Sequence, residues 1–223
     1  MFEGIFSGVF AFVSGNQGSN AFLLKGGREI ALIDSSTSEN RLVILSGLSL
    51  LGVSPESVSL ILHTHAHADH LGLDFLFPNA RIAMHESDAK LINSGNRAFA
   101  CAQFFSGTIL PHVSMPLRHL QKIRLGDISL KVLHTPGHTA GSVCFFLEGQ
   151  KALFSGDTLF AEGFGRTDLP SGSPKEMPES LQGLQSLGIK ALLPGHGPCV
   201  FGLKKAEECL SNAVKSALTN AFL

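Results

Sequence analysis

The feature that most constrains this chain is a run of four histidines and one aspartate within residues 63–70. It directly follows residues 58–62, Val-Ser-Leu-Ile-Leu, an apolar segment typical of a buried β-strand. A buried strand delivers the polar residues that follow it to the edge of a sheet. Imidazole and carboxylate groups together suit zinc, iron or manganese. The sequence therefore predicts a metal site at the end of a buried strand.

The composition favours a globular enzyme-sized domain. Hydrophobic residues make up 44% of the 223 residues and charged residues 16%, which argues against a disordered chain. The length suits a single domain, residues 1–223. The net charge of −1 lacks the basic excess of a nucleic-acid binder, so we expect no nucleic-acid partner. No uncharged apolar run reaches about 18 residues, so no membrane contact is expected.

The terminus and the cysteines indicate a cytoplasmic protein. Residues 1–13 are apolar but contain Glu3 and no Lys or Arg, so they suit an opening strand better than a signal peptide. The four cysteines lack the CxxC spacing of a zinc finger and are interpreted as reduced thiols. They are Cys101, Cys144, Cys199 and Cys209.

The hydrophobic periodicity predicts strands and helices in alternation, repeated in two halves. Gly and Pro mark the turns between them. The predicted elements are a hairpin at 22–34, helices at 39–51, 71–76, 177–187 and 203–219, a helix beginning at Ser87 as its N-cap, and strands at 58–62, 81–84, 128–134, 142–147, 151–155 and 191–193.

Residues 93–119 break this pattern. They hold several large apolar residues, among them Phe104 and Phe105, without clear periodicity. We interpret the segment as a lid or wall over the site. The alternative is an ordinary helical insertion that packs on the core.

Four further polar residues follow predicted strands, with Gly or Pro beside most of them. Such turn positions are where scaffolds place functional groups, and Gly and Pro fix the backbone there. We therefore expect these side chains to meet the histidine run at one edge. The four are Asp34, His138, Asp157 and His196.

The motifs resemble those of a known family. Residues 64–70 contain the pattern HxHxDH, and the segments 135–142, 155–160 and 194–198 match the later motifs in order. Together they resemble the metallo-β-lactamase fold superfamily over nearly the whole chain, and within it most closely the short glyoxalase-II-like hydrolases. The resemblance implies an α/β (α+β) fold, a four-layer αββα sandwich.

The resemblance also implies two divalent metal ions, with zinc expected first and iron or manganese as alternatives. A hydroxide between the ions would attack the substrate, and Asp69 would orient it and later take its proton. The implied ligands are His65, His67 and His138 for the first ion, Asp69, His70 and His196 for the second, and Asp157 as the bridge.

His63 and Arg166 lie close in sequence to the motif residues but are not among the implied ligands. A motif beginning at His63 would require aspartate at position 67, which is histidine. We therefore expect His63 to be a hydrogen-bonded side chain within the strand rather than a ligand. We expect Arg166 to pair with Asp168 and hold the loop after Asp157. The alternative is that Arg166 binds the substrate.

Three functions compete. The first is a dinuclear hydrolase of a small thioester or ester, which the full ligand set favours. The second is a mononuclear iron persulfide dioxygenase, whose group shares the stretch 165–168. Its iron would be held by His65, by His138 or His67, and by Asp157. The third is a non-catalytic metal-binding protein. Because only 27 residues follow His196 (223 − 196), we expect no glutathione-binding helical domain of the glyoxalase II kind.

Overall fold

The computed structural model describes residues 1–220, which form two β-sheets packed face to face. The first sheet contains, in spatial order, β1 (Glu3–Phe6), β2 (Val9–Phe12), β3 (Ala21–Gly26), β4 (Glu29–Ile33), β5 (Leu60–Leu62), β6 (Arg81–His85) and β7 (Met115–Leu117). The second contains β13 (Val200–Phe201), β12 (Ala191–Pro194), β11 (Ala152–Gly156), β10 (Val143–Leu147), β9 (Ile128–His134) and β8 (Lys122–Leu125).

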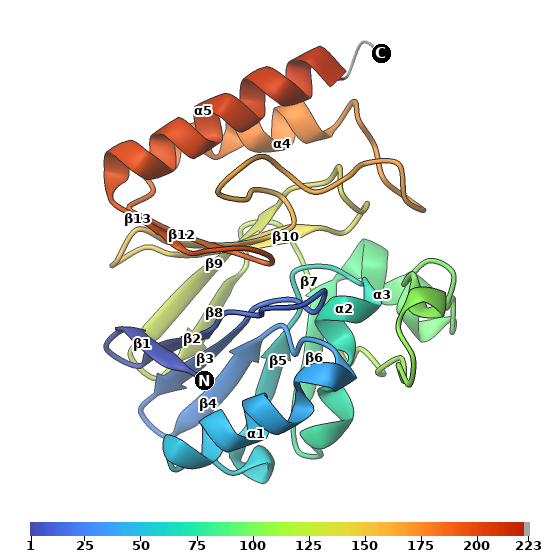
Figure 1. Cartoon of the computed structure of the whole chain (residues 1–223), viewed down its shortest axis with the longest axis vertical. Helices are drawn as coiled ribbons and strands as arrows, with labels where there is room; N and C mark the ends of the chain where they lie inside the picture. The colour runs from blue at the N-terminus through green and yellow to red at the C-terminus, as the bar shows by residue number, and fades with distance from the viewer. Residues whose placement is uncertain (221–223) are drawn as a thin grey trace.

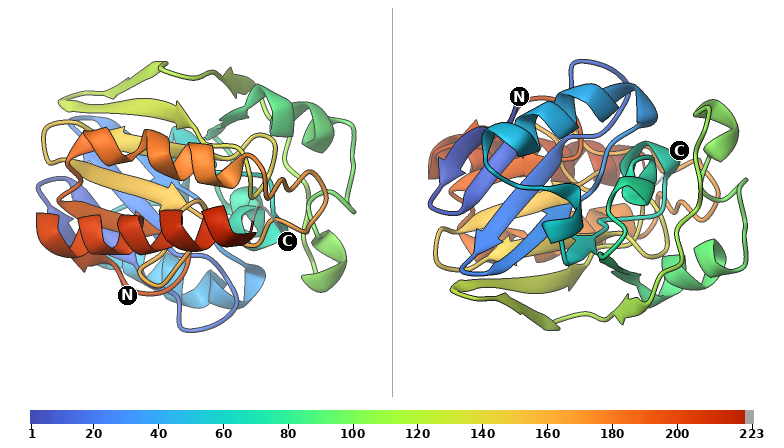
Figure 2. Two further views of the ribbon diagram at one scale, coloured as in Figure 1. Left: turned by 90° about the horizontal axis from the view of Figure 1, so that it is seen from above. Right: turned by 90° about the horizontal axis from the view of Figure 1, so that it is seen from below.

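Helices cover the two outer faces. α1 (Arg41–Leu50) and α3 (Glu86–Asn93) pack on the seven-stranded sheet, and α2 (Ala68–Leu71) is a single turn after β5. α4 (Met177–Gly183) and α5 (Leu203–Asn220) lie side by side across the six-stranded sheet (Figures 1 and 2). The predicted four-layer αββα sandwich is confirmed.

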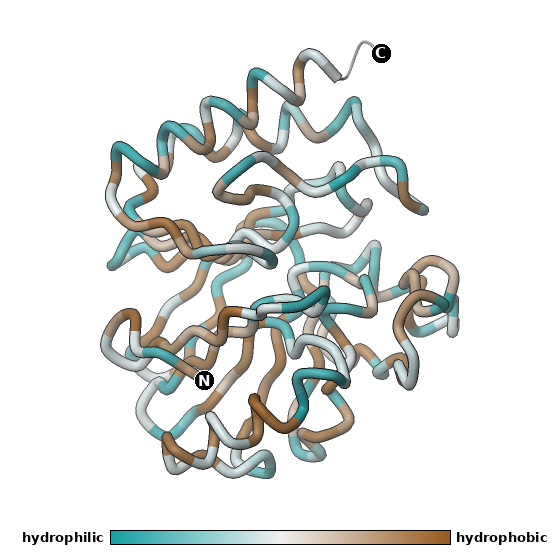
Figure 3. Tube along the Cα trace, in the orientation of Figure 1, coloured by the Kyte–Doolittle hydropathy of each residue, from teal (hydrophilic) through white to brown (hydrophobic). Residues whose placement is uncertain are grey.

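The core between the sheets is an apolar layer to which both contribute. Strand β9 alternates, so that Ile128, Leu130 and Val132 are buried while the residues between them are partly exposed. Phe22 of β3 meets Phe154 of β11 edge to face, with ring centroids 5.1 Å apart. Figure 3 shows hydrophobic segments gathered along the strands. This layer fixes the distance between the sheets.

Parallel pairing brings the strand ends to one edge. β4, β5 and β6 run parallel in the first sheet, and β11 and β12 run parallel in the second. Their carboxyl ends therefore deliver the residues that follow them to a common place. A direct backbone bond joins the two edges there, since Val143 N–H donates to Thr64 O at 2.8 Å.

Most predicted elements are confirmed, with four differences. The helix expected at 71–76 begins earlier as α2 and continues as a 3₁₀ turn. The opening strand is a pair, β1 and β2, joined through Gly8 at φ 72°. The cap of α3 is His85, whose Nδ1 accepts from Ser87 N–H at 3.4 Å, and not Ser87 as predicted. Strands β7, β8 and β13 were not predicted, because they are short and gain order from neighbouring strands.

Within residues 1–220, no helix is both long and apolar enough to cross a membrane. All four cysteines are free thiols.

The layer between the sheets should dominate stability. We expect Phe154→Ala to lower the free energy of unfolding by about 3–5 kcal/mol, because it leaves a cavity against Phe22. Phe201→Ala, at a half-exposed ring on edge strand β13, should cost less than about 1 kcal/mol. Urea unfolding of both variants measures this. Equal losses would show that the inter-sheet layer is not the main core.

Candidate metal centre

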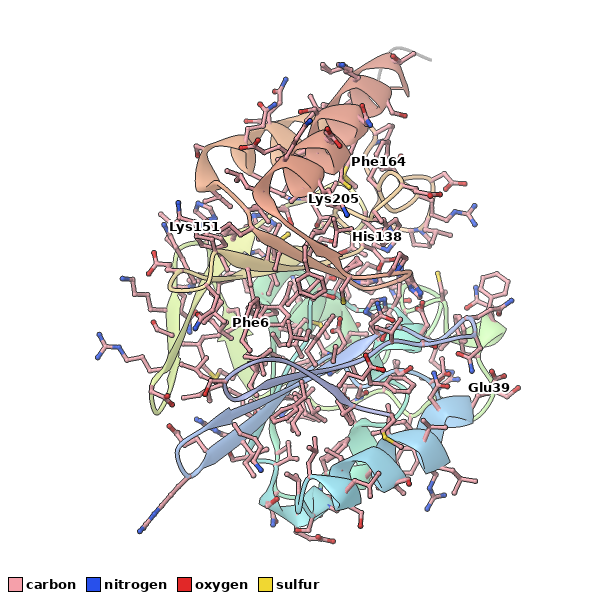
Figure 4. The ribbon with its side chains drawn as sticks, turned by 60° about the vertical axis from the view of Figure 1, so that its left-hand side comes forward. Phe6, Glu39, His138, Lys151, Phe164 and Lys205 are labelled. Atoms are coloured by element: carbon pink, nitrogen blue, oxygen red, sulfur yellow. The ribbon has the colours of Figure 1, made fainter. Side chains whose placement is uncertain are left out.

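The predicted ligands all lie in loops at the joined strand ends. The loop after β5 supplies His65, His67, Asp69 and His70, and the loops after β9, β11 and β12 supply His138, Asp157 and His196. In Figure 4, His138 lies beside the end of the six-stranded sheet, whereas Phe164 lies nearer α5. The structure brings all seven side chains together.

The first donor group consists of three imidazoles from both sheets. His67 Nδ1 lies 3.1 Å from His65 Nε2 and 2.8 Å from His138 Nε2, and the last two atoms lie 3.2 Å apart. A tetrahedral zinc ion with Zn–N bonds of about 2.0–2.1 Å separates its nitrogens by about 3.3 Å. This triangle is therefore slightly tighter than a zinc site and has the right shape for one.

Hydrogen bonds from the other ring nitrogens set the tautomers. His138 Nδ1–H donates to Arg166 O at 2.7 Å, which leaves the Nε2 lone pair facing the triangle. His65 Nδ1 lies 3.1 Å from Thr64 Oγ1, and that hydroxyl in turn donates to Asp34 Oδ2 at 2.8 Å. Partners of this kind orient metal-binding histidines and raise their basicity.

The second donor group lies beside the first. His196 Nε2 is 3.1 Å and His70 Nε2 is 3.8 Å from Asp69 Oδ2. Asp157 stands between the groups: its Oδ1 is 3.3 Å from His70 Nε2, and its Oδ2 is 3.5 Å from His138 Nε2. One carboxylate thus faces both groups, as a bridging ligand would.

Two buried atoms support a cation in this place. His70 Nε2 and Asp157 Oδ1 are buried without a hydrogen-bond partner, and they face each other. Leaving such atoms unpaired is costly, and a metal ion between them would satisfy both. The donor set of imidazole and carboxylate fits zinc, iron or manganese.

The charge states favour ligation by the histidines of the first group. Burial lowers the pKa of His65 well below its usual range, and the nearby His70 and His138 lower it further. Burial and His138 lower the pKa of His67 to about 3. Burial raises the pKa of Asp157, but the charges of His70 and His138 outweigh it and hold that pKa low. Neutral imidazoles and an ionised carboxylate are the forms that bind metal.

Asp34, at the end of β4, supports the loop from below. Its carboxylate accepts from Thr64 N–H at 2.9 Å and from His70 Nδ1–H at 2.8 Å. Its φ of 55° is a strained, left-handed conformation that a functional contact often imposes. Burial raises the pKa of Asp34, but His70 and His63 outweigh it and lower the pKa to about 2. The sequence predicted this residue's place but not its partners.

His63 is a hydrogen-bonded side chain outside both donor groups, as predicted, although it lies just after β5 rather than within it. Its Nε2 lies 2.8 Å from Asp74 Oδ2, and its Nδ1 lies 3.4 Å from Asp34 Oδ1. Burial lowers the pKa of His63, but these two carboxylates outweigh it and raise the pKa to about 9. The protonated ring therefore links the 3₁₀ turn that begins at Asp74 to Asp34 at the end of β4.

Asp88 of α3 is a supporting residue that the sequence did not indicate. Its Oδ2 accepts from Ala66 N–H at 3.1 Å and from Thr139 Oγ1–H at 2.8 Å. These two partners lie next to ligands on opposite sheets, so Asp88 clamps the two loops of the first donor group. It occupies an ordinary position of an amphipathic helix, which gave no signal.

A cavity of about 380 Å³ opens beside the donor groups. Its floor includes His67, Asp69, His138, Asp157 and His196. Its walls are Cys101, Phe104 and Phe105 from the 93–119 segment, and Phe160, Gly165, Arg166 and Leu169 from the loop after Asp157. The wall predicted from residues 93–119 is confirmed, although the segment also packs on the core through Phe99 and Val113.

The predicted Arg166–Asp168 pair is confirmed. Arg166 Nε and Nη2 donate to the two carboxylate oxygens at 2.7 and 2.6 Å, and both side chains are well exposed. The pair stiffens the loop whose backbone oxygen holds His138.

Glycine is required where the loops approach most closely. A Cβ at Gly195 would collide with Asp157 Oδ1 and with the His70 ring. The Pro-Gly-His turn therefore serves to bring His196 close to the other donors.

We expect Asp34→Asn to weaken metal binding by about 10–100-fold, because an amide holds His70 less firmly than a carboxylate does. Competition with a chelating dye measures the affinity. Asp127→Asn, in the exposed turn after β8, is the matched control and should leave it unchanged. Equal affinity of both variants would contradict the supporting role.

Asp88 should make stability depend on pH. Burial raises its pKa from 3.8 to about 6, despite the opposing hydrogen bond from Thr139. A carboxyl group with a raised folded-state pKa stabilises the fold at low pH and loses that contribution as pH rises from about 4 to about 6. Asp88→Asn lacks this titration. In metal-free protein, the wild-type free energy of unfolding relative to the variant should fall by about 3 kcal/mol across this window. A constant difference in urea unfolding would contradict it.

Two relatives of this chain are described as hydrolases. It is 32% identical over 186 residues to a probable metallo-hydrolase of Methanocaldococcus jannaschii, a match that covers 80% of the chain and 87% of that protein. It is 31% identical over 170 residues to a hydroxyacylglutathione hydrolase of Prochlorococcus marinus, covering 72% of the chain but only 57% of that protein.

Solved structures share the fold. A metallo-beta-lactamase family protein of Thermus thermophilus superposes with a TM-score of 0.80 at 25% identity, covering 96% of this chain and 80% of that one. A protein crystallised in a di-iron-bound form superposes with a TM-score of 0.70 at 32% identity, covering 90% and 98%. The family model described as the metallo-beta-lactamase superfamily matches residues 14–196. The chain therefore belongs to the metallo-β-lactamase superfamily.

Proposed function

We propose that this protein is a dinuclear metal-dependent hydrolase that cleaves a small thioester or ester. The observation that supports this most strongly is the pair of donor groups on either side of the Asp157 carboxylate. The superfamily consists mostly of metal-dependent hydrolases, and the similarity to a hydroxyacylglutathione hydrolase favours acyl transfer to water.

Under this proposal, His65, His67 and His138 hold one divalent ion, and Asp69, His70 and His196 hold the other. Zinc is the first choice, with iron or manganese as alternatives. When bound, such a pair of ions lowers the pKa of water toward neutrality and polarises a carbonyl group.

The chain's own residues supply positioning and proton transfer. Asp69 lies at the cavity floor, with a carboxylate oxygen 3.1 Å from His196 Nε2. It can orient the attacking water, accept its proton and pass that proton to the leaving thiolate or alkoxide. Asp157 fixes the spacing of the two groups, and the walls of the cavity hold the acyl group and exclude bulk water.

The mononuclear persulfide dioxygenase remains the second candidate, because the stretch 165–168 suits that group too. In that enzyme one iron would be held by His65, by His138 or His67, and by Asp157. The convergence of Asp69, His70 and His196 would then serve no metal ion. The bond from His138 to Arg166 O serves either enzyme. The second donor group therefore favours the hydrolase.

We propose further that the enzyme acts as a single domain, in the cytoplasm, on a small molecule, and without nucleic-acid or membrane partners. The free cysteines and the near-zero net charge support this view.

Metal content and activity together test the function. Protein purified without added metal should contain two zinc ions per chain and hydrolyse simple thioesters. Asp157→Ala should lose at least one ion and reduce kcat/KM by more than about 1000-fold, because both ions depend on that carboxylate. Asp127→Ala is the matched control.

A different outcome would identify the second candidate. A single iron per chain, oxygen uptake with glutathione persulfide and no thioester hydrolysis would overturn the hydrolase proposal. Two tightly bound ions in Asp157→Ala would contradict its bridging role.

A further inference from the structure

Two segments give the cavity beside the donor groups apolar lining. Cys101, Phe104 and Phe105 come from the 93–119 segment, and Phe160 and Leu169 come from the loop after Asp157. The Phe160 ring lies 6.1 Å from the His196 ring, centroid to centroid, so the apolar surface reaches the donor groups themselves. Whatever group lies next to the reacting carbonyl therefore contacts hydrocarbon.

The phenylalanine side is an ordered structure. Ala68 N–H, between His67 and Asp69, donates to Ala100 O at 2.8 Å and ties the 93–119 segment to the ligand residues that follow β5. Thr108 Oγ1–H donates to Phe105 O at 3.0 Å, which closes the turn from the other end. The wall is therefore fixed relative to the reacting atoms, as a specificity-determining surface must be.

The two rings differ in exposure. Phe105 is half-buried and packs on the core, whereas Phe104 is 69% exposed at the mouth of the cavity. An exposed aromatic ring beside a concave apolar site gains most from covering by an apolar ligand.

The walls present no unpaired positive charge. Apart from histidines, Arg166 is the only basic residue that lines the cavity within residues 1–220, and Asp168 neutralises it through two hydrogen bonds. A carrier with several carboxylates, such as glutathione, would find no free cation on these walls.

We infer that the cavity selects thioesters or esters with an apolar, aromatic-sized acyl group, and that Phe104 and Phe105 are the residues that select it. This inference rests on the proposed hydrolase function. The reaction forms an acyl C–O bond from water and breaks the C–S bond of a thioester or the acyl C–O bond to the alkoxy group of an ester. One proton of the water ends on the leaving thiol or alcohol, and the other ends on the carboxylic acid. The rings contact the acyl group and take no part in proton transfer.

Thioesters that share one leaving thiol, N-acetylcysteamine, test the selection. The phenylacetyl thioester should have a kcat/KM at least about 10-fold above that of the acetyl and hydroxyacetyl thioesters. Phe104→Ala and Phe105→Ala should each lower the phenylacetyl value by about 5–20-fold and change the acetyl value less than about 2-fold. Phe75→Ala, at a partly exposed ring that does not line this cavity, is the matched control and should change neither.

Binding of an analogue that cannot be hydrolysed tests the apolar pocket separately from the hydrolase function. The ketone analogue of the phenylacetyl thioester, with CH₂ in place of sulfur, should bind by calorimetry and bind about 10-fold more weakly to Phe105→Ala. If the analogue binds in this way but no ester or thioester is hydrolysed, the hydrolase proposal fails and the apolar pocket stands. If all thioesters react equally, or the phenylalanine variants affect acetyl and phenylacetyl alike, the inference fails and the hydrolase stands. A preference for hydroxyacyl-glutathione over phenylacetyl thioester would also overturn it.

Discussion

Apolar packing between the two sheets is the interaction on which the metal centre depends. Neither donor group is complete on one sheet: His65 and His67 follow β5 of the first sheet, whereas His138 follows β9 of the second. Contacts such as that of Phe22 with Phe154 set the distance between the sheets, and through it the distances between the ligand nitrogens. Metal binding at this site would therefore be thermodynamically linked to folding. An ion that binds only the assembled site stabilises the fold, and a cavity in the inter-sheet layer weakens the site without touching a ligand.

A second layer of polar groups converts this coarse alignment into ligand geometry. Asp34 acts within the first sheet, where it joins the end of β4 to the residues that follow β5 through Thr64 and His70. Asp88 acts between the sheets, because Ala66 and Thr139 belong to different loops. Burying such carboxylates is unfavourable unless they are hydrogen-bonded, and each of these accepts several bonds. Their orientation is thus enforced by the cost of leaving them unpaired, which is a sharper constraint than apolar contact alone.

The sequence predicted the ligands better than their supports for a physical reason. A ligand such as His138 or Asp157 must follow an apolar strand and sit beside Gly or Pro, and this leaves a local pattern in the chain. Asp88 is distinguished only by residues distant in sequence that fold over it, so no local pattern marks it. The same holds for the short strands β7 and β13, whose order comes from pairing with β6 and β12. His63 could be distinguished from the ligands by sequence alone, because a motif that begins at His63 would need aspartate at position 67, where the chain has histidine.

The cavity separates chemistry from selection. Its floor is built from strand-end residues whose positions the two sheets fix, and these include the carboxylate of Asp69 that would move the proton. Its wall residues come from the 93–119 segment and the loop after Asp157, and they lie outside the named strands of both sheets. Replacing Phe104 or Leu169 would therefore change the groups that the cavity accepts without moving a donor atom. Under the proposed function, such a division would let one set of metal ligands act on different substrates, so the identity of the substrate must be argued from the walls and not from the ligands.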